Sequence, residues 1–167
     1  GKVNVINSLA ESVNVFFYDL PVKLGIDRIE AFLKPFMFGQ LTGLDIAGEK
    51  RGILPSRAWK KANRNMIWFP GETVITGIGQ GYFVITPVQM AQALSILVSK
   101  GQYSPSHLIQ KDTQSTPIPI NIADKHWDTV HQGMTAVINA RNGTARALAS
   151  DDYIFAGKSG TSQVYGK

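Results

Sequence analysis

Cysteine is absent from this sequence of 167 residues. A disulfide framework, a thiolate metal site and a cysteine nucleophile are therefore excluded. Long hydrophobic runs are also absent, because no apolar stretch approaches the roughly 18 residues that a membrane-spanning helix requires. The first residues, GKVNVINSLAESVN, lack the charged and then apolar pattern of a signal peptide. No targeting segment is recognisable in the sequence.

The sequence has no concentrated charge of either sign. Its 17 Lys and Arg residues against 12 Asp and Glu residues give a net charge of +5. The basic residues are scattered, and the densest group, Lys60, Lys61 and Arg64, lies in a polar stretch typical of a solvated surface. Nucleic acid is therefore not an expected partner. The hydrophobic content of 44% is that of a folded globular domain and not of a disordered segment.

Apolar spacing predicts two helices near the start of the chain. Leu9, Val13, Phe16 and Leu20 follow helical spacing, which predicts one helix over residues 4–20, closed by Pro21. The stretch IDRIEAFLK predicts a second, short helix that ends at Pro35. Residues 39–71 contain several glycines and weak periodicity, which indicates connecting structure.

Two further helices are predicted in the second half. Thr86 and Gln89 form a Thr-x-x-Gln capping box around Pro87, so a helix is expected to begin there and to end near Lys100. Its predicted core-facing stripe comprises Val88, Ala91, Leu94 and Val98. The spacing of Trp127, Val130, Met134, Val137 and Ile138 predicts a helix over residues 124–139, followed by a loop.

A strand is predicted near the end of the chain. In DYIFAGKSGTSQVY, aromatic and β-branched residues flank Lys158 on both sides. A single strand cannot satisfy its backbone hydrogen bonds alone. Partner strands are therefore expected elsewhere in a longer protein.

The centre of this strand, GKSGTS, fits two kinds of site. A nucleotide P-loop needs G-x-x-x-x-G-K-[ST], but Asp152 stands where its first glycine should be. A K-[ST]-G triad on a strand is typical of penicillin-recognising serine enzymes, and Lys158, Ser159 and Gly160 match it. The context favours the second interpretation.

The other candidates for chemistry are weak by themselves. Ser12 and Asn14 form the only Ser-x-Asn of the chain, which alone also fits a polar turn with Asn14 as a helix cap. His107, His126 and His131 lack metal-ligand spacing, and neither H-E-x-x-H nor G-x-S-x-G occurs. We expect no metal and no cofactor. The stretch GIGQG lacks dinucleotide-loop spacing and indicates a tight turn.

Three blocks taken in order carry a resemblance. Ser12-Val13-Asn14 followed by FFY, then GETVITGIGQGYFVITPVQMAQAL, then GKSGTSQ resemble the transpeptidase domain of class B penicillin-binding proteins over nearly the whole chain. The middle block most resembles the elongation-specific branch of that family. The resemblance implies an α/β fold, the penicillin-binding serine transpeptidase fold, in which helices flank an antiparallel sheet.

The resemblance also implies the site residues. Ser12, Asn14 and Lys158 would be catalytic, and Ser159, Gly160, Thr161 and Ser162 would bind the substrate. The family's catalytic set comprises S-x-x-K, S-x-N and K-[ST]-G. The first of these has no match, because no lysine of this sequence has a serine three residues before it. We therefore expect residues 1–167 to form a partial domain that lacks the nucleophile segment and the C-terminal strands and helix, and to be inactive alone.

For the longer protein, the resemblance implies a peptidoglycan D,D-transpeptidase at the periplasmic face of the bacterial inner membrane, held by an N-terminal helix. Its implied partners are a peptidoglycan stem peptide, β-lactam antibiotics and a cell-elongation glycosyltransferase. The alternatives left open are a β-lactam sensor, a class D-like β-lactamase, a nucleotide-binding module and a degraded, non-catalytic copy.

Overall fold

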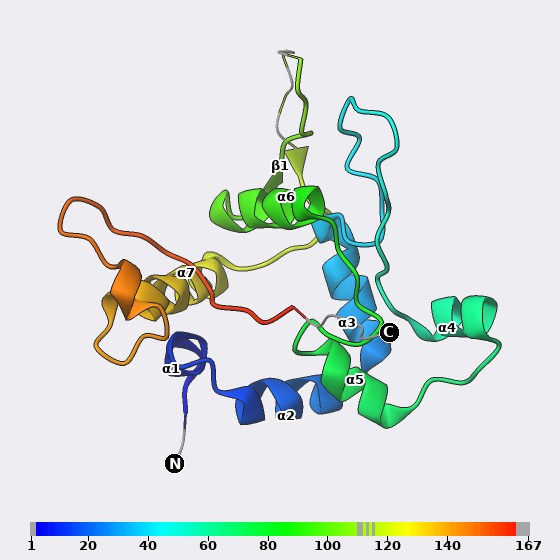
Figure 1. Ribbon diagram of the computed structural model, residues 1–167, viewed down its shortest axis with the longest axis horizontal. Helices are drawn as coiled ribbons and strands as arrows, with labels where there is room; N and C mark the ends of the chain where they lie inside the picture. The colour runs from blue at the N-terminus through cyan, green and yellow to red at the C-terminus, as the bar shows by residue number, and fades with distance from the viewer. Residues whose placement is uncertain (1–2, 110–111, 113, 115, 163–167) are drawn as a thin grey trace. The chain divides into compact units, whose positions relative to one another are not determined.

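The computed structural model describes residues 3–109, 112, 114 and 116–162. The chain divides into two compact units (Figure 1). One consists of Gly1–Asp19 with Ile122–Lys167, and the other is Leu20–Asn121. Helix α2 (Asn14–Leu24) belongs in part to each unit. No helix within the described ranges is long and apolar enough to span a membrane.

The first unit is built on helix α7 (Asp124–Asn139), which has the bounds predicted from its apolar spacing. Helix α1 (Val5–Ala10) packs against it (Figure 1), and Ala10 and Val137 are almost fully buried. A Cβ on Gly133 would lie 2.5 Å from Cδ1 of Leu9. The two helices can approach this closely only because residue 133 has no side chain.

The prediction of one helix over residues 4–20 is wrong. Helix α1 ends at Ala10, α2 begins at Asn14, and Ser12 between them has φ 52°, in the left-handed region that a continuing helix cannot use. Pro21 does not close α2 either. It is buried inside that helix, which runs on to Leu24 and ends before Gly25, whose φ is 77°.

The second unit holds most of the remaining helices. Helix α3 spans Ile26–Leu33 as predicted, and the 3-10 turn η1 spans Lys34–Phe36. Residues 39–71 were predicted as connecting structure, but they contain helix α4 (Arg57–Arg64) and the start of helix α5 (Pro70–Thr76). Helix α4 is short and rich in charged residues, so its apolar periodicity was too weak to predict it.

In the basic group of α4, Lys61 and Arg64 lie at the solvated surface as predicted, but Lys60 does not. It is completely buried, and its Nζ donates to Oε1 of Glu72 at 2.5 Å. The same Nζ lies 4.3 Å from the centroid of the Phe69 ring. The other oxygen of Glu72 accepts a bond of 2.7 Å from the backbone N–H of Phe69. This ion pair therefore ties α4 to the start of α5.

Helix α6 (Pro87–Val98) begins at the predicted capping box, with Thr86 N to Gln89 Oε1 at 2.9 Å and Gln89 N to Thr86 Oγ1 at 3.2 Å. Its predicted core stripe is wrong, since Leu94 and Val98 are 43% and 67% exposed while Gln89 is fully buried. The amide of Gln89 donates to the carbonyl oxygens of Gln40 and Arg51 at 2.7 and 2.6 Å. Hydrogen bonds to loop carbonyls thus decide which face of α6 is buried.

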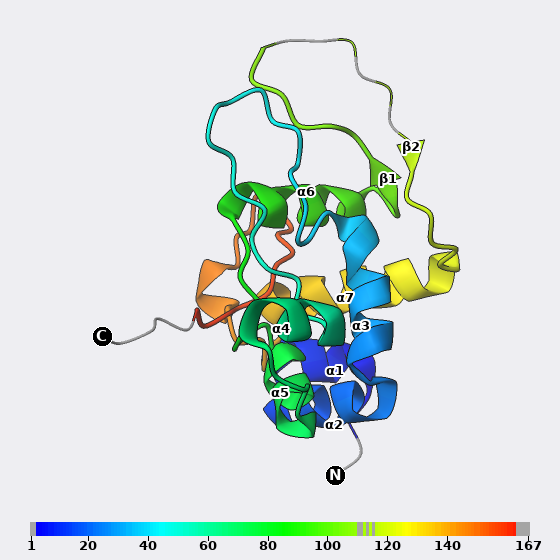
Figure 2. The ribbon, with the colours of Figure 1, turned by 90° about the vertical axis from the view of Figure 1, so that its right-hand side faces the viewer.

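Regular β structure is sparse in the described residues. Strands β1 (Gln102–Tyr103) and β2 (Thr116–Pro117) pair antiparallel in the second unit (Figure 2). The predicted strand around Lys158 is not formed, because residues 153–162 have no neighbouring strand to pair with in the part of the chain that the structure describes. Their hydrogen bonds go to helix α7 instead.

Candidate active site

Ser12 lies in the turn that separates α1 from α2. Its N–H bonds to the carbonyl of Leu9 at 3.2 Å, and the next N–H, of Val13, bonds to the carbonyl of Ser8 at 3.0 Å. A serine with positive φ is uncommon and costs about 1–2 kcal/mol. Asn14 is exposed and is the first residue of α2, not its cap. The turn therefore sets Ser12 and Asn14 at the start of a helix.

Helix α7 holds the segment that carries Lys158. The N–H of Gly157 donates to the carbonyl of Met134 at 3.1 Å. The amide of Asn139 donates to the carbonyl of Phe155 at 2.7 Å and to that of Thr135 at 2.9 Å. These bonds replace a β-ladder and fix the path of the chain into Lys158.

Lys158 meets Ser12 although 146 positions separate them in the sequence. Its Nζ donates to Ser12 Oγ at 2.7 Å, to the carbonyl oxygen of Ser159 at 2.8 Å and to Ser159 Oγ at 3.2 Å. An ammonium group has three protons, so each has an acceptor. The Lys-Ser-Gly and Ser-x-Asn motifs therefore meet through one charge-assisted hydrogen bond.

Two electrostatic consequences follow for this pair. The lysine side chain is largely exposed, yet partial desolvation lowers the pKa of Lys158 from its ordinary value of 10.5. Because Ser12 Oγ accepts from the ammonium, the hydroxyl proton of Ser12 is not used in this bond. The arrangement can therefore present a serine proton to a group that enters the site.

Gly160, Thr161 and Ser162 follow along the exposed part of the same segment. Nothing lies within 4 Å of the position that a Cβ on Gly160 would occupy, so the described chain leaves that side open. Neither Lys158 nor Ser159 lies in a helix. In a P-loop the corresponding residues would open a helix, so the nucleotide-binding interpretation does not fit.

Thr144 is a contact that the sequence reading missed. Its Oγ1 lies 2.9 Å from Ser159 Oγ, and its N–H donates to the carbonyl of Ala10 at 3.0 Å. Beside it, Nδ2 of Asn142 donates to Oε1 of Glu11 at 2.5 Å. The sequence predicted a loop after residue 139, but no local pattern pointed to what that loop contacts.

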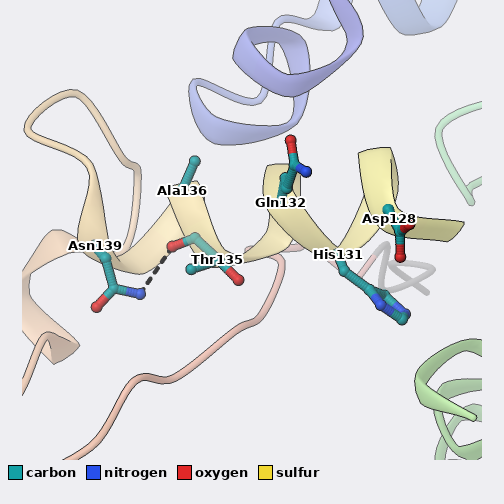
Figure 3. A pocket seen from close by; sticks show the side chains of 6 residues that line it. All are labelled: Asp128, His131, Gln132, Thr135, Ala136 and Asn139. Carbon is teal, nitrogen blue, oxygen red and sulfur yellow. Dashed lines mark hydrogen bonds between the residues drawn. The ribbon is translucent and has the colours of Figure 1, made fainter. Parts of the chain in front are cut away.

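One side of α7 carries a shallow hollow of about 460 Å³ (Figure 3). It is lined by Asp128, His131, Gln132, Thr135, Ala136 and Asn139. Only one carboxylate and one imidazole are among these side chains. In the part of the chain that the structure describes, no three His, Asp or Glu side chains gather as metal ligands.

Comparison with known proteins decides the family. The family model described as "Penicillin binding protein transpeptidase domain" matches residues 1–167. The chain belongs to the penicillin-binding protein transpeptidase family. The resemblance and the partial fold predicted from the sequence are thereby confirmed.

Relatives within this family include proteins named MrdA and PBP2. The chain is 39% identical to the peptidoglycan D,D-transpeptidase MrdA of Escherichia coli K12 over 177 residues, which cover 99% of the chain and 28% of that protein. It is similar to the solved structure of Pseudomonas aeruginosa PBP2 in complex with WCK 5153, with 43% identity and a TM-score of 0.88. This match covers 97% of the present chain and 39% of the Pseudomonas chain.

Helicobacter pylori PBP2, solved in complex with MreC, is 32% identical with a TM-score of 0.89, over 98% of this chain and 31% of that one. The chain spans less than a third of the length of Escherichia coli MrdA. The elongation-type branch inferred from the middle block agrees with these matches.

Proposed function

We propose that the chain is part of a peptidoglycan D,D-transpeptidase, which cross-links stem peptides through a serine acyl-enzyme and is acylated by β-lactams. The observation that supports this most is the 2.7 Å hydrogen bond from Lys158 Nζ to Ser12 Oγ. It joins two motifs that serve one acyl transfer in the family. The activity belongs to the longer protein, with the acylating serine and its S-x-x-K lysine upstream of these residues.

In the proposed reaction, the upstream serine attacks the carbonyl between the two terminal D-alanines of a stem peptide. The C–N bond breaks, and the terminal D-alanine leaves with a proton on its nitrogen. An amine of a neighbouring stem then attacks the acyl-enzyme and releases the serine. A β-lactam follows the first half only, because its opened ring stays attached and blocks the second attack.

Ser12 would relay the proton to the leaving nitrogen. Its oxygen accepts from Lys158, which leaves its own proton available for donation. The amide of Asn14, two positions further along, would bond the amide backbone of the substrate. Both residues lie at the start of α2.

The Lys158 segment would bind the other end of the substrate. The ammonium charge and the hydroxyls of Ser159 and Thr161 suit a terminal carboxylate. The open side at Gly160 leaves room for a substrate backbone, with Ser162 at the end of that surface. The N–H of Thr161 would supply one donor of the oxyanion hole, and the N–H of the upstream serine the other.

The proposed setting is the periplasmic face of the inner membrane, with an anchor helix outside these residues and a glycosyltransferase partner. The similarity to Helicobacter pylori PBP2, whose solved structure is a complex with MreC, supports an elongation assembly as the surroundings of the protein.

The test is intact-mass analysis after incubation with benzylpenicillin, on residues 1–167 and on a form extended upstream through the S-x-x-K segment. We expect only the extended form to gain one penicilloyl mass, and to keep it for hours. A matched control replaces the S-x-x-K serine by alanine. Absence of an adduct on the extended form would refute the proposal, and rapid hydrolysis of the adduct would favour a β-lactamase.

A further inference from the structure

The loop of residues 140–145, between α7 and the 3-10 turn η2 (Arg146–Leu148), contacts both halves of the site. Its Thr144 N–H donates to the carbonyl of Ala10, two residues before Ser12. The hydroxyl of the same residue lies 2.9 Å from Ser159 Oγ, next to Lys158. Thr144 is thus bonded to the segments that carry both motifs.

The loop is fixed tightly against the end of α7. The N–H of Gly143 donates to the carbonyl of Ala140 at 3.0 Å, and that of Ala145 donates to the carbonyl of Val137 at 2.9 Å. A Cβ on Gly143 would lie only 2.3 Å from the Val137 oxygen. The position of the Thr144 hydroxyl is therefore determined by the helix that also holds the Lys158 segment.

The hydrogen bonds at Ser159 show what this hydroxyl can do. A serine hydroxyl has two acceptor positions and one proton. Ser159 Oγ accepts from the Lys158 ammonium at 3.2 Å. If Thr144 donates the second bond, both acceptor positions are occupied, and the proton of Ser159 is the remaining group that can be donated to an incoming ligand.

We propose that Thr144 is a positioning residue of this site, which orients the Ser159 hydroxyl so that it donates its proton to the carboxylate of the substrate or β-lactam. The inference rests on the proposed function, because it assumes that a carboxylate binds beside Ser159. It adds a third element, the 140–145 loop, to the Ser-x-Asn and Lys-Ser-Gly motifs from which the site was predicted.

The test measures the second-order rate constant for acylation by benzylpenicillin in the full-length protein. Thr144→Val keeps the shape of the side chain and removes its hydroxyl, so we expect a loss of roughly two- to tenfold, the effect of one neutral hydrogen bond. Thr144→Ser keeps the hydroxyl and should stay within about twofold of wild type. Thr129→Val is the matched control, because its hydroxyl bonds only to a carbonyl of its own helix, that of Lys125.

A second readout separates positioning from a loss of structure. In a Ser159→Ala background, Thr144→Val should have no further effect on acylation, because the group that it orients is gone. An equal loss in both backgrounds, or a loss in Thr144→Ser as large as in Thr144→Val, would overturn the inference while the wild type is still acylated. A wild type that gains no penicilloyl group would instead refute the proposed function itself, and the inference with it.

Discussion

Replacement of Lys158 by methionine removes the ammonium and keeps the length of the side chain. The variant loses the charge-assisted hydrogen bond of 2.7 Å to Ser12 Oγ and the cation beside the carboxylate site. A hydrogen bond to a charged group contributes about 1.5–3 kcal/mol. Since this site is open to solvent, we take a value in the lower half of that range, about 2 kcal/mol. At 1.36 kcal/mol per factor of ten, this predicts a decrease of about thirtyfold in the acylation rate constant.

The assay is the time course of penicilloyl mass on the full-length protein at several benzylpenicillin concentrations. Lys125→Met is the matched control, because it removes an exposed lysine at the first turn of α7, away from the site. Circular dichroism of both variants would test whether they keep their helices. An acylation rate for Lys158→Met within threefold of wild type would refute the reasoning, because the Lys158–Ser12 bond would then contribute nothing to acylation.

Three further predictions concern stability and pH. Gly143→Ala should lower the free energy of unfolding by about 1–3 kcal/mol, because the added Cβ would lie 2.3 Å from the carbonyl oxygen of Val137. The control is Gly160→Ala, whose Cβ would face open space and should leave the thermal transition unchanged. Lys60→Met should lower the free energy of unfolding by about 2–4 kcal/mol in urea titrations, because it leaves the carboxylate of Glu72 partly buried without its cation. Adding Glu72→Gln should restore part of that loss. An unchanged stability of Lys60→Met would contradict the stabilising role of this ion pair. Desolvation lowers the pKa of Lys158, and the protonated form polarises Ser12, so the acylation rate constant should fall as pH rises through a value below 10.5. Lys158→Arg should abolish this fall. A rate constant that does not change up to pH 10.5 would contradict the role of the Lys158 charge.

Local signals predicted the elements whose caps and spacing agree with their packing. Helix α7 was predicted with its observed bounds, and α6 begins at the predicted Thr86 capping box. In both cases the signal is local, since apolar spacing marks the extent of α7 and a capping box marks the start of α6. The break between α1 and α2 at Ser12 could not be predicted in this way, because apolar spacing does not reveal a single residue with positive φ.

Other failures share a physical cause, which is contact between residues that are not adjacent in the sequence. Gln89 is buried because it bonds carbonyls 38 and 49 positions away, against the apolar pattern of its helix. Lys60 is buried by Glu72, a partner on the next helix. The meeting of Ser12 with Lys158 was implied only by family resemblance, and the contact of Thr144 with Ser159 was not implied at all.

The central claim is that Ser12 and Lys158 act as one unit in acyl transfer. The most direct test is a double-mutant cycle on the acylation rate constant of the full-length protein, with Ser12→Ala, Lys158→Met and both together. If the two residues act through their mutual hydrogen bond, the double variant should acylate about as fast as the slower single variant. If the two losses multiply, each residue acts alone, and the proposed coupling of the two motifs is contradicted.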